Sequence, residues 1–356
     1  MRILIVDTCY PAFLKSHYRR SPGLETQPYA IQWRALMDTF FGTADAYSHN
    51  LTTIGHDSHE LVVNCAPLQA AWAREHDLAV PDEGAEEAIL LAQAREFAPD
   101  VVYVQHVHYL SDATLAELKR LGRLLVGQIA TEPPSLDRLR TFDLLVTCLP
   151  SFVARFNAEG VRTELLRLAF DERVLEELAP ELRPRSRGAV FVGSLGRTQH
   201  RRSNGMIARA ARRVPIEFWG YGGRLWPPWS PIKRGYRGEA WGRDMFRILG
   251  EARVAVNRHG SIAGPYAVNM RLYEATGMGS LLVTDNGEQL GDVLRPEEEA
   301  VSYSTAHELV ERLRYFLDHE DERAAIAAAG QARTLSDHTY RQRMRQLAAM
   351  LEDAAA

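Results

Sequence analysis

The sequence has few cysteines and lacks the short motifs of several common catalytic sites. Its 356 residues include three cysteines, Cys9, Cys65 and Cys148, which form no CxxC pair. A disulfide framework and a structural zinc site are therefore not expected. An Asp-x-Asp motif, a Walker loop, a zinc-protease helix and a serine nucleophile elbow are also missing from the sequence. We expect no bound metal.

Long apolar runs and an excess of either charge are missing as well. No apolar run approaches the roughly 20 residues that cross a bilayer, so no transmembrane segment is expected. The opening MRILIVD is too short for the core of a signal peptide, which predicts a cytoplasmic protein. The formal net charge is -4, with 42 Lys and Arg against 46 Asp and Glu. This balance gives no global attraction to nucleic acid or to an anionic membrane, although charge can be unevenly distributed. No nucleic-acid partner is expected.

The length and composition predict two globular domains. Domains have roughly 100–200 residues each, and the chain is 46% hydrophobic and 25% charged. Residues 181–188, ELRPRSRG, interrupt the periodic pattern with proline, glycine and basic residues. We therefore predict one domain over residues 1–185 and a second over 186–335. A last helix over 336–356 is expected to return to the first domain.

Short apolar runs alternate with segments of helical spacing in both halves, which predicts α/β domains with doubly wound parallel sheets. We expect two Rossmann-like domains that face each other across a cleft. The runs that predict strands are Arg2–Asp7, Glu60–Asn64, Val101–Gln105, Leu124–Ile129, Asp143–Cys148, Glu164–Ala169, Ala189–Gly193, Ile216–Gly220, Arg253–Asn257, Leu281–Asp285 and Ala300–Ser304.

A glycine-containing basic segment follows the first strand of the second half. Gly193 and Ser194 let backbone amides approach a phosphate closely, and Arg197, Arg201 and Arg202 can neutralise its charge. Open α/β sheets bind ligands beyond the carboxyl ends of their strands, where this segment lies. A solvated basic turn would have the same composition, so both interpretations stay open.

A second candidate region begins at Asn269. Asn269, Arg271 and Glu274 lie in a segment of helical spacing, and a carboxylate such as Glu274 suits the paired hydroxyls of a ribose. Thr284 and Asp285 end the next strand, at the edge where a ligand would lie. The alternative is a helix stabilised by a salt bridge.

Two histidines follow a strand of the first half. His106 and His108 are two residues apart, so an extended backbone would place both side chains on one side. A neutral imidazole can accept a hydroxyl proton near neutral pH, and this makes both residues candidate catalytic bases. One structural and one solvent-facing histidine would explain the pattern equally well.

The sequence resembles the CgeB-like branch of glycosyltransferases. The similarity is carried by residues 269–285, NMRLYEATGMGSLLVTD, and continues through 297–303, 319–330 and 338–340. Shorter matches occur earlier, at 55–57 and 68–72, so the resemblance covers most of the chain.

The resemblance implies the two-domain GT-B architecture of group 1-type glycosyltransferases. It implies a nucleoside-diphosphate sugar as co-substrate, bound by the second domain without a metal or another cofactor, and an acceptor bound by the first. Glu274 is similar to the ribose-binding glutamate of a Glu-seven-residues-Glu pattern, but Tyr266 stands at the position of the first glutamate. Tyr221 and Arg237 are similar to residues that line the nucleotide base.

Transfer of a hexosyl group is thus the leading expectation. Arg197 and Arg271 would stabilise the departing diphosphate, and closure of the two domains would exclude water. A nucleotide-sugar epimerase or a phosphorylase is an alternative enzyme, because a fold does not dictate a reaction. A non-catalytic protein that binds nucleotide sugars is an alternative of another class.

Overall fold

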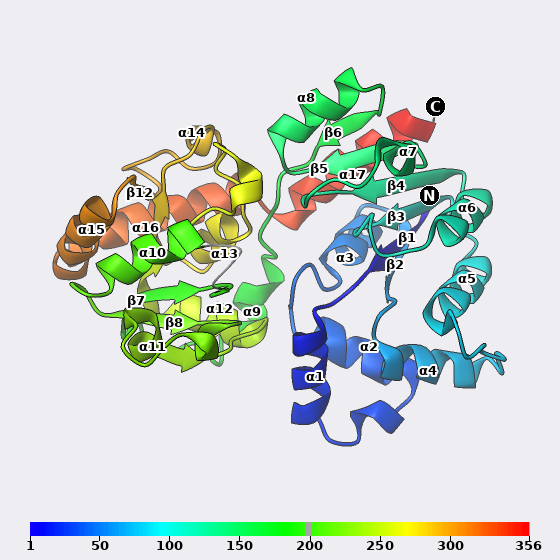
Figure 1. The fold of residues 1–356 in the computed structure, drawn as a ribbon, viewed down its shortest axis with the longest axis horizontal. Coiled ribbons are helices and arrows are strands. Elements are labelled where there is room, and N and C mark those ends of the chain that lie inside the picture. The colour runs from blue at the N-terminus through cyan, green and yellow to red at the C-terminus, as the bar shows by residue number, and fades with distance from the viewer. Residues whose placement is uncertain (197–200, 356) are drawn as a thin grey trace. The chain divides into compact units, whose positions relative to one another are not determined.

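The protein folds into two compact units, each built on its own parallel sheet. The computed structural model describes residues 1–196 and 201–355. The first unit contains Met1–Arg167 and Arg343–Ala356, and the second contains Leu168–Gln342 (Figure 1). The predicted domain limits at residues 185 and 335 stay predictions.

The first unit has a six-stranded sheet in the order β2-β1-β3-β4-β5-β6, in which every described strand pair is parallel. Its strands are β1 (Arg2–Asp7), β2 (Asp57–Val62), β3 (Val101–Val104), β4 (Leu124–Gln128), β5 (Leu144–Thr147) and β6 (Thr163–Leu165). Its helices are α1 (Pro11–Arg20), η1 (Leu24–Thr26), α2 (Tyr29–Met37), α3 (Ala46–Thr53), α4 (Ala66–Glu75), α5 (Ala85–Phe97), α6 (Asp112–Leu121), α7 (Leu136–Leu139) and α8 (Pro150–Ala158).

The second unit has a six-stranded parallel sheet in the order β12-β11-β10-β7-β8-β9. Its strands are β7 (Arg187–Val192), β8 (Ile216–Trp219), β9 (Tyr236–Gly238), β10 (Ala252–Val256), β11 (Leu281–Asp285) and β12 (Val301–Tyr303). Its helices are α9 (Arg173–Leu178), α10 (Arg201–Ala210), η2 (Gly223–Leu225), α11 (Pro231–Gly235), α12 (Arg243–Glu251), η3 (Ser261–Ala263), α13 (Arg271–Gly277), α14 (Leu290–Val293), α15 (Ala306–Asp318) and α16 (Glu320–Asp337).

These two sheets with their flanking helices confirm the predicted fold class. Strands β3, β4 and β5 are buried along their whole length, except for the half-buried Gln128, because helices cover both faces of each sheet. Capping side chains mark the N-termini of two of the flanking helices. The Ser111 side chain accepts a hydrogen bond from the Thr114 N–H and so caps α6, and Thr305 caps α15 in the same way.

The last helix, α17 (Tyr340–Ala355), joins the first unit from Arg343 onward. Arg343 Nε donates to the Arg167 carbonyl at 3.0 Å, and Arg162 forms an ion pair with Asp353. The apolar positions Met344, Leu347 and Leu351 are fully buried, which gives the helix one packed face.

The first unit encloses an ionisable side chain in its core. Glu60 on β2 is buried, and its carboxylate accepts hydrogen bonds from the Ser48 N–H, at 2.8 Å, and from the Ser48 hydroxyl. Burial raises the pKa of Glu60 to about 8, and the nearby Asp45 and Asp7 carboxylates add to the shift. The folded protein therefore holds this proton at pH values where the unfolded chain releases it.

We expect the free energy of unfolding to fall as the pH rises from about 5 to about 8, by at most about 1.4 kcal/mol per pH unit for one proton. Glu60→Gln should remove this slope, because glutamine does not ionise. Urea unfolding at several pH values measures the slope, with the exposed Glu83→Gln as the control. An unchanged slope in Glu60→Gln would contradict the assignment.

Candidate functional site

The sheet of the second unit changes its winding direction between β7 and β10. The chain runs from β7 outward to β8 and β9, then returns to the other side of β7 and continues through β10 to β11 and β12. Crossover connections thus leave these two neighbouring strands in opposite directions. Ligands of open α/β sheets bind in the crevice beyond the carboxyl ends of such a strand pair. The residues that follow β7 and β10 are therefore the candidate ligand-binding positions of this unit.

Arg258 links the segments that follow these two strands. Its Nη2 donates to the Ser194 carbonyl at 2.7 Å, and its Nε donates to Asn204 Oδ1 at 2.9 Å. Asn204 Nδ2 in turn donates to the Gly196 carbonyl at 2.9 Å. Burial lowers the pKa of Arg258 to about 10, so the guanidinium stays charged at neutral pH. Arg258 thereby fixes the backbone of the segment that begins at Gly193 and places a buried positive charge beside it.

An amide network joins the ends of β10 and β11 to the start of α13. Asn257 Nδ2 donates to Thr284 Oγ1 at 3.0 Å, and Asn269 Nδ2 donates to Asn257 Oδ1 at 3.0 Å. Asn269 Oδ1 accepts from the Leu272 N–H at 3.2 Å, which satisfies a free amide at the start of α13. The Asn269 and Thr284 side chains are thus linked to each other through Asn257.

Asp285 holds His259 in a fixed orientation. The His259 backbone N–H donates to Asp285 Oδ1 at 2.8 Å, and His259 Nδ1 lies 2.8 Å from the same oxygen. When Nδ1 of a neutral imidazole donates to this carboxylate, the Nε2 atom is a hydrogen-bond acceptor. The side chain is 7% exposed, and Nε2 has no hydrogen-bond partner among the described residues. A buried polar atom without a partner costs about 1–3 kcal/mol, which points to a polar group that meets it from beyond the described residues.

Glu274 lies on α13 and is buried. Arg271 Nη1 lies 2.8 Å from Glu274 Oε2, so the helix does contain the salt bridge that the sequence offered as an alternative. Arg271 Nη1 also lies 2.9 Å from Met245 Sδ. Burial raises the pKa of Glu274, and the Arg271 charge opposes this shift. The ion pair leaves the carboxylate able to accept further hydrogen bonds, and it occupies Arg271, which the sequence had placed near a diphosphate.

The remaining predicted ligand residues lie around the end of β8. Gly193 N–H donates to the Trp219 carbonyl at 3.0 Å, and Gly220 has φ +132°. A Cβ on Gly220 would lie 2.1 Å from the Gly193 carbonyl oxygen, so this close approach requires glycine. Tyr221 and Arg237 are exposed. Arg197 lies outside the described residues.

The first unit has its own change of winding direction, between β1 and β3. Asp7 ends β1 and His106 follows β3, so the two residues lie at this point in the sheet. His106 Nε2 lies 3.2 Å from Asp7 Oδ1, and the Asp7 side chain is mostly buried while His106 is half exposed. A carboxylate in this position orients the imidazole.

Arg138 fixes the turn that carries His106. Its Nε donates to the Val107 carbonyl at 2.8 Å, and its other nitrogens bind the Leu110 carbonyl and Asp112. The strand ends at Val104, so the two histidines lie on a turn rather than on an extended backbone. His108 is exposed, and its side chain has no hydrogen bond or ion pair with the described residues.

Three residues that sequence reasoning missed are Asp7, Arg258 and His259. Asp7 ends β1, and Arg258 and His259 come two and three residues after the end of β10, so their place beyond the carboxyl ends of strands is the signal that could have found them. Their roles depend on which strands are neighbours, because Arg258 reaches the end of β7 and Asp7 reaches the turn after β3.

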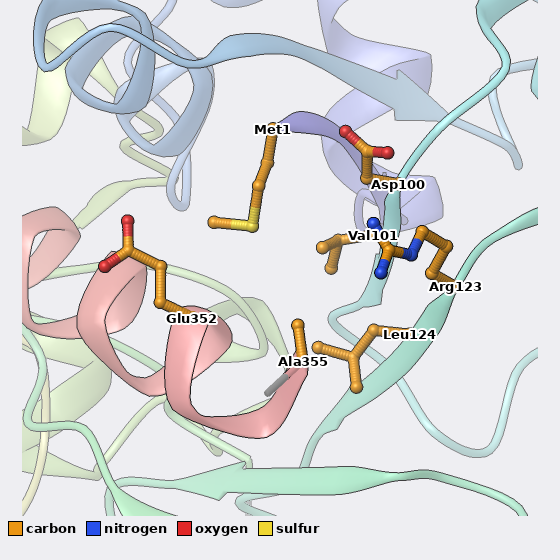
Figure 2. A pocket seen from close by; sticks show the side chains of 7 residues that line it. All are labelled: Met1, Asp100, Val101, Arg123, Leu124, Glu352 and Ala355. Atoms are coloured by element: carbon orange, nitrogen blue, oxygen red, sulfur yellow. The ribbon is translucent and has the colours of Figure 1, made fainter.

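A pocket of about 350 Å³ lies at the opposite edge of the first sheet. Figure 2 shows Met1, Asp100 and Arg123, which precede β1, β3 and β4, together with Glu352 and Ala355 of α17. The pocket therefore lies at the amino ends of these strands. Since open α/β sheets bind ligands at the carboxyl ends, we place the candidate site elsewhere.

Within residues 1–196 and 201–355, no group of three or more His, Cys, Asp or Glu side chains is placed to hold a metal ion. The same residues contain no helix of the length and apolar character that a membrane crossing requires.

Comparison with known proteins places the chain among glycosyltransferase folds. Residues 199–349 match a family described as glycosyl transferase-like, and no curated protein matches the chain. The structure is similar to HepE from Anabaena in complex with UDP-glucose, with 15% identity, a TM-score of 0.61 and coverage of 99% of this chain and 100% of HepE.

Two other solved structures have the same architecture. Sucrose-phosphate synthase from Thermosynechococcus elongatus is 12% identical, with a TM-score of 0.58 and coverage of 99% of this chain and 98% of that one. AviGT4, a glycosyltransferase involved in avilamycin A biosynthesis, is 12% identical, with a TM-score of 0.57 and coverage of 100% and 98%. The two-sheet architecture is therefore the GT-B fold, and the second half of the chain carries a glycosyltransferase-like domain.

Proposed function

We propose that this chain, with its glycosyltransferase-like domain over residues 199–349, transfers a hexosyl group from a nucleoside-diphosphate sugar to an acceptor without a metal. The observation that carries the proposal is the polar cluster at the β7/β10 switch point of the second unit, most of which lies in the matched stretch. Arg258 and His259 are buried there, and Arg258 fixes the backbone that follows β7. Glu274 is buried on α13, and Asn269, which precedes this helix, is hydrogen-bonded to the Arg258 carbonyl. We also assign the chain to the CgeB-like branch, on the motif at residues 269–285.

Each group of the cluster has a role in donor binding. The segment from Gly193 to Arg197 binds the diphosphate, and Arg258 fixes the backbone of this segment and contributes positive charge. Glu274 accepts hydrogen bonds from the ribose hydroxyls. His259 Nε2, held by Asp285, accepts a hydrogen bond from a hydroxyl of the donor sugar, which gives the unpartnered nitrogen its partner.

The first unit supplies the proton acceptor. His106, oriented by Asp7, takes the proton of the acceptor hydroxyl as the new glycosidic bond forms. The bond between the sugar and the nucleoside diphosphate breaks in the same transfer. The negative charge that develops on the leaving diphosphate is stabilised by arginine side chains rather than by a divalent cation.

Calorimetry with UDP, GDP, ADP, CDP and TDP and with their sugar conjugates tests this function. We expect the nucleoside diphosphate of one base to bind, with a Kd that does not change when EDTA replaces Mg²⁺. The sugar conjugate of this nucleotide should be consumed when an acceptor is present. Binding that disappears with EDTA would remove the metal-independent assignment. Failure of every nucleotide to bind would remove the donor site itself.

A further inference from the structure

The second unit carries a strongly basic stretch in a chain that is acidic as a whole. Residues 209–237 contain seven Lys or Arg and one acidic residue, Glu217, whereas the whole chain has a net charge of -4. Glu217 is already paired, because Arg187 Nη1 lies 2.9 Å from its carboxylate. The positive charge of this stretch is therefore not neutralised within it.

The cations of this stretch lie on neighbouring elements and point to solvent. Arg209 lies on α10, Arg212 and Arg213 follow it, Arg224 lies on η2 and Arg234 lies on α11. All five are exposed, and none of them forms an ion pair with another described residue. Helix α10 contacts α11, and α11 contacts η2. We call the exposed side of these three elements, with the turn that follows α10, the α10–α11 surface.

Two large apolar side chains stand out from the same surface. Leu225 is 72% exposed and Trp229 is 74% exposed. The loop that carries them is fixed, because Trp226 Nε1 donates to the Leu195 carbonyl at 2.8 Å and Ile232 is fully buried. Lys233 Nζ donates to the Arg224 carbonyl at 3.1 Å and so joins the two ends of the loop. Leu225 and Trp229 therefore project into solvent from an ordered loop.

Exposed cations beside exposed apolar side chains favour one kind of partner over the other polyanions. Exposed cations attract any polyanion, but an aliphatic tip such as Leu225 has no ring on which a nucleic-acid base could stack. Apolar and tryptophan side chains surrounded by Lys and Arg are typical of segments that lie at the headgroup level of a bilayer. We propose that the α10–α11 surface docks on a bilayer that contains anionic lipids, with Leu225 and Trp229 entering the interface. This docking does not depend on the proposed transfer reaction.

Sedimentation with vesicles tests the docking. We expect the full-length protein to bind vesicles of equal parts phosphatidylcholine and phosphatidylglycerol, to bind pure phosphatidylcholine far more weakly, and to be released by added NaCl. The double variant Leu225→Ser/Trp229→Ser should bind the anionic vesicles at least about tenfold more weakly. The matched control Ile31→Ser/Tyr315→Ser removes exposed apolar side chains outside the surface and should bind as the wild type does.

The charge contribution is tested separately with Arg212→Gln and Arg213→Gln. Each should weaken binding about fivefold, because a cation near an anionic leaflet contributes about 1 kcal/mol. The exposed Arg95→Gln and Arg183→Gln are the controls and should have no effect. Equal binding to neutral and anionic vesicles, or no binding to either, would overturn the proposal. A nucleic-acid result would also overturn the proposal: single-stranded DNA would displace the protein from vesicles, and it would bind the Leu225→Ser/Trp229→Ser variant as tightly as the wild type.

Discussion

His106→Ala lowers kcat by about 10²–10⁴-fold and leaves the affinity for the donor nucleotide unchanged, which is the largest effect that we expect. Of the two candidate bases, His106 is the one that contacts a carboxylate, since its Nε2 lies 3.2 Å from Asp7 Oδ1. Asp7→Asn should lower kcat by a similar order, because the amide cannot stabilise a charged imidazole. Single-turnover assays with saturating donor measure the rate, and calorimetry measures the donor Kd.

His108→Ala is the matched control for this prediction. His108 lies on the same turn, two residues away, and is exposed without a side-chain bond to the described residues. We expect it to retain nearly the wild-type kcat. A full loss in His108→Ala together with normal turnover in His106→Ala would reverse the assignment. Normal turnover in both variants would remove the histidines from the mechanism.

Glu274→Gln weakens binding of the nucleoside diphosphate by up to about 100-fold, because hydrogen bonds to a charged group contribute about 1.5–3 kcal/mol. The amide keeps the size of the side chain but loses the charge and one acceptor oxygen. Calorimetry with the free nucleotide measures the Kd. The same loss should appear for the deoxyribose nucleotide in the wild type, because that ligand lacks one of the two hydroxyls.

The ion pair with Arg271 requires a stability measurement beside the Kd. Glu274 and Arg271 are both largely buried, and removing one member of a buried pair costs about 3–5 kcal/mol of stability. We expect Glu274→Gln to lower the Tm as well as the affinity. The control is Thr276→Val, which removes a buried hydroxyl of the same helix from its bond to Thr334. A Tm loss without any loss of nucleotide affinity in Glu274→Gln would make the glutamate a structural residue.

The sheets could be predicted well from the sequence because buried parallel strands are nearly continuous apolar runs. The predicted runs Arg2–Asp7 and Leu281–Asp285 coincide with β1 and β11. Strand β9 was missed. It has three residues, Tyr236–Gly238, at the edge of its sheet, and pairs with β8 through a shifted register, so it has no apolar run of its own.

The candidate site could be predicted in part. Positions such as Ser194 and Asp285 followed from the rule that ligands lie beyond the carboxyl ends of strands. Local periodicity does not determine the order of strands in a sheet. The contacts of Arg258 with Ser194 and of Asp7 with His106 could therefore not be predicted. Whether Glu274 pairs with an arginine also depends on side-chain placement that spacing alone does not determine.

The return of α17 to the first unit has a consequence for synthesis of the protein. Domains generally fold as units while the chain emerges from the ribosome. The second unit, Leu168–Gln342, is continuous and can complete its core before translation ends. The first unit emerges earlier, yet the residues that bury Met344, Leu347 and Leu351 have no partner for them until α17 has emerged. The half of the protein that is made first is therefore the half that finishes folding last.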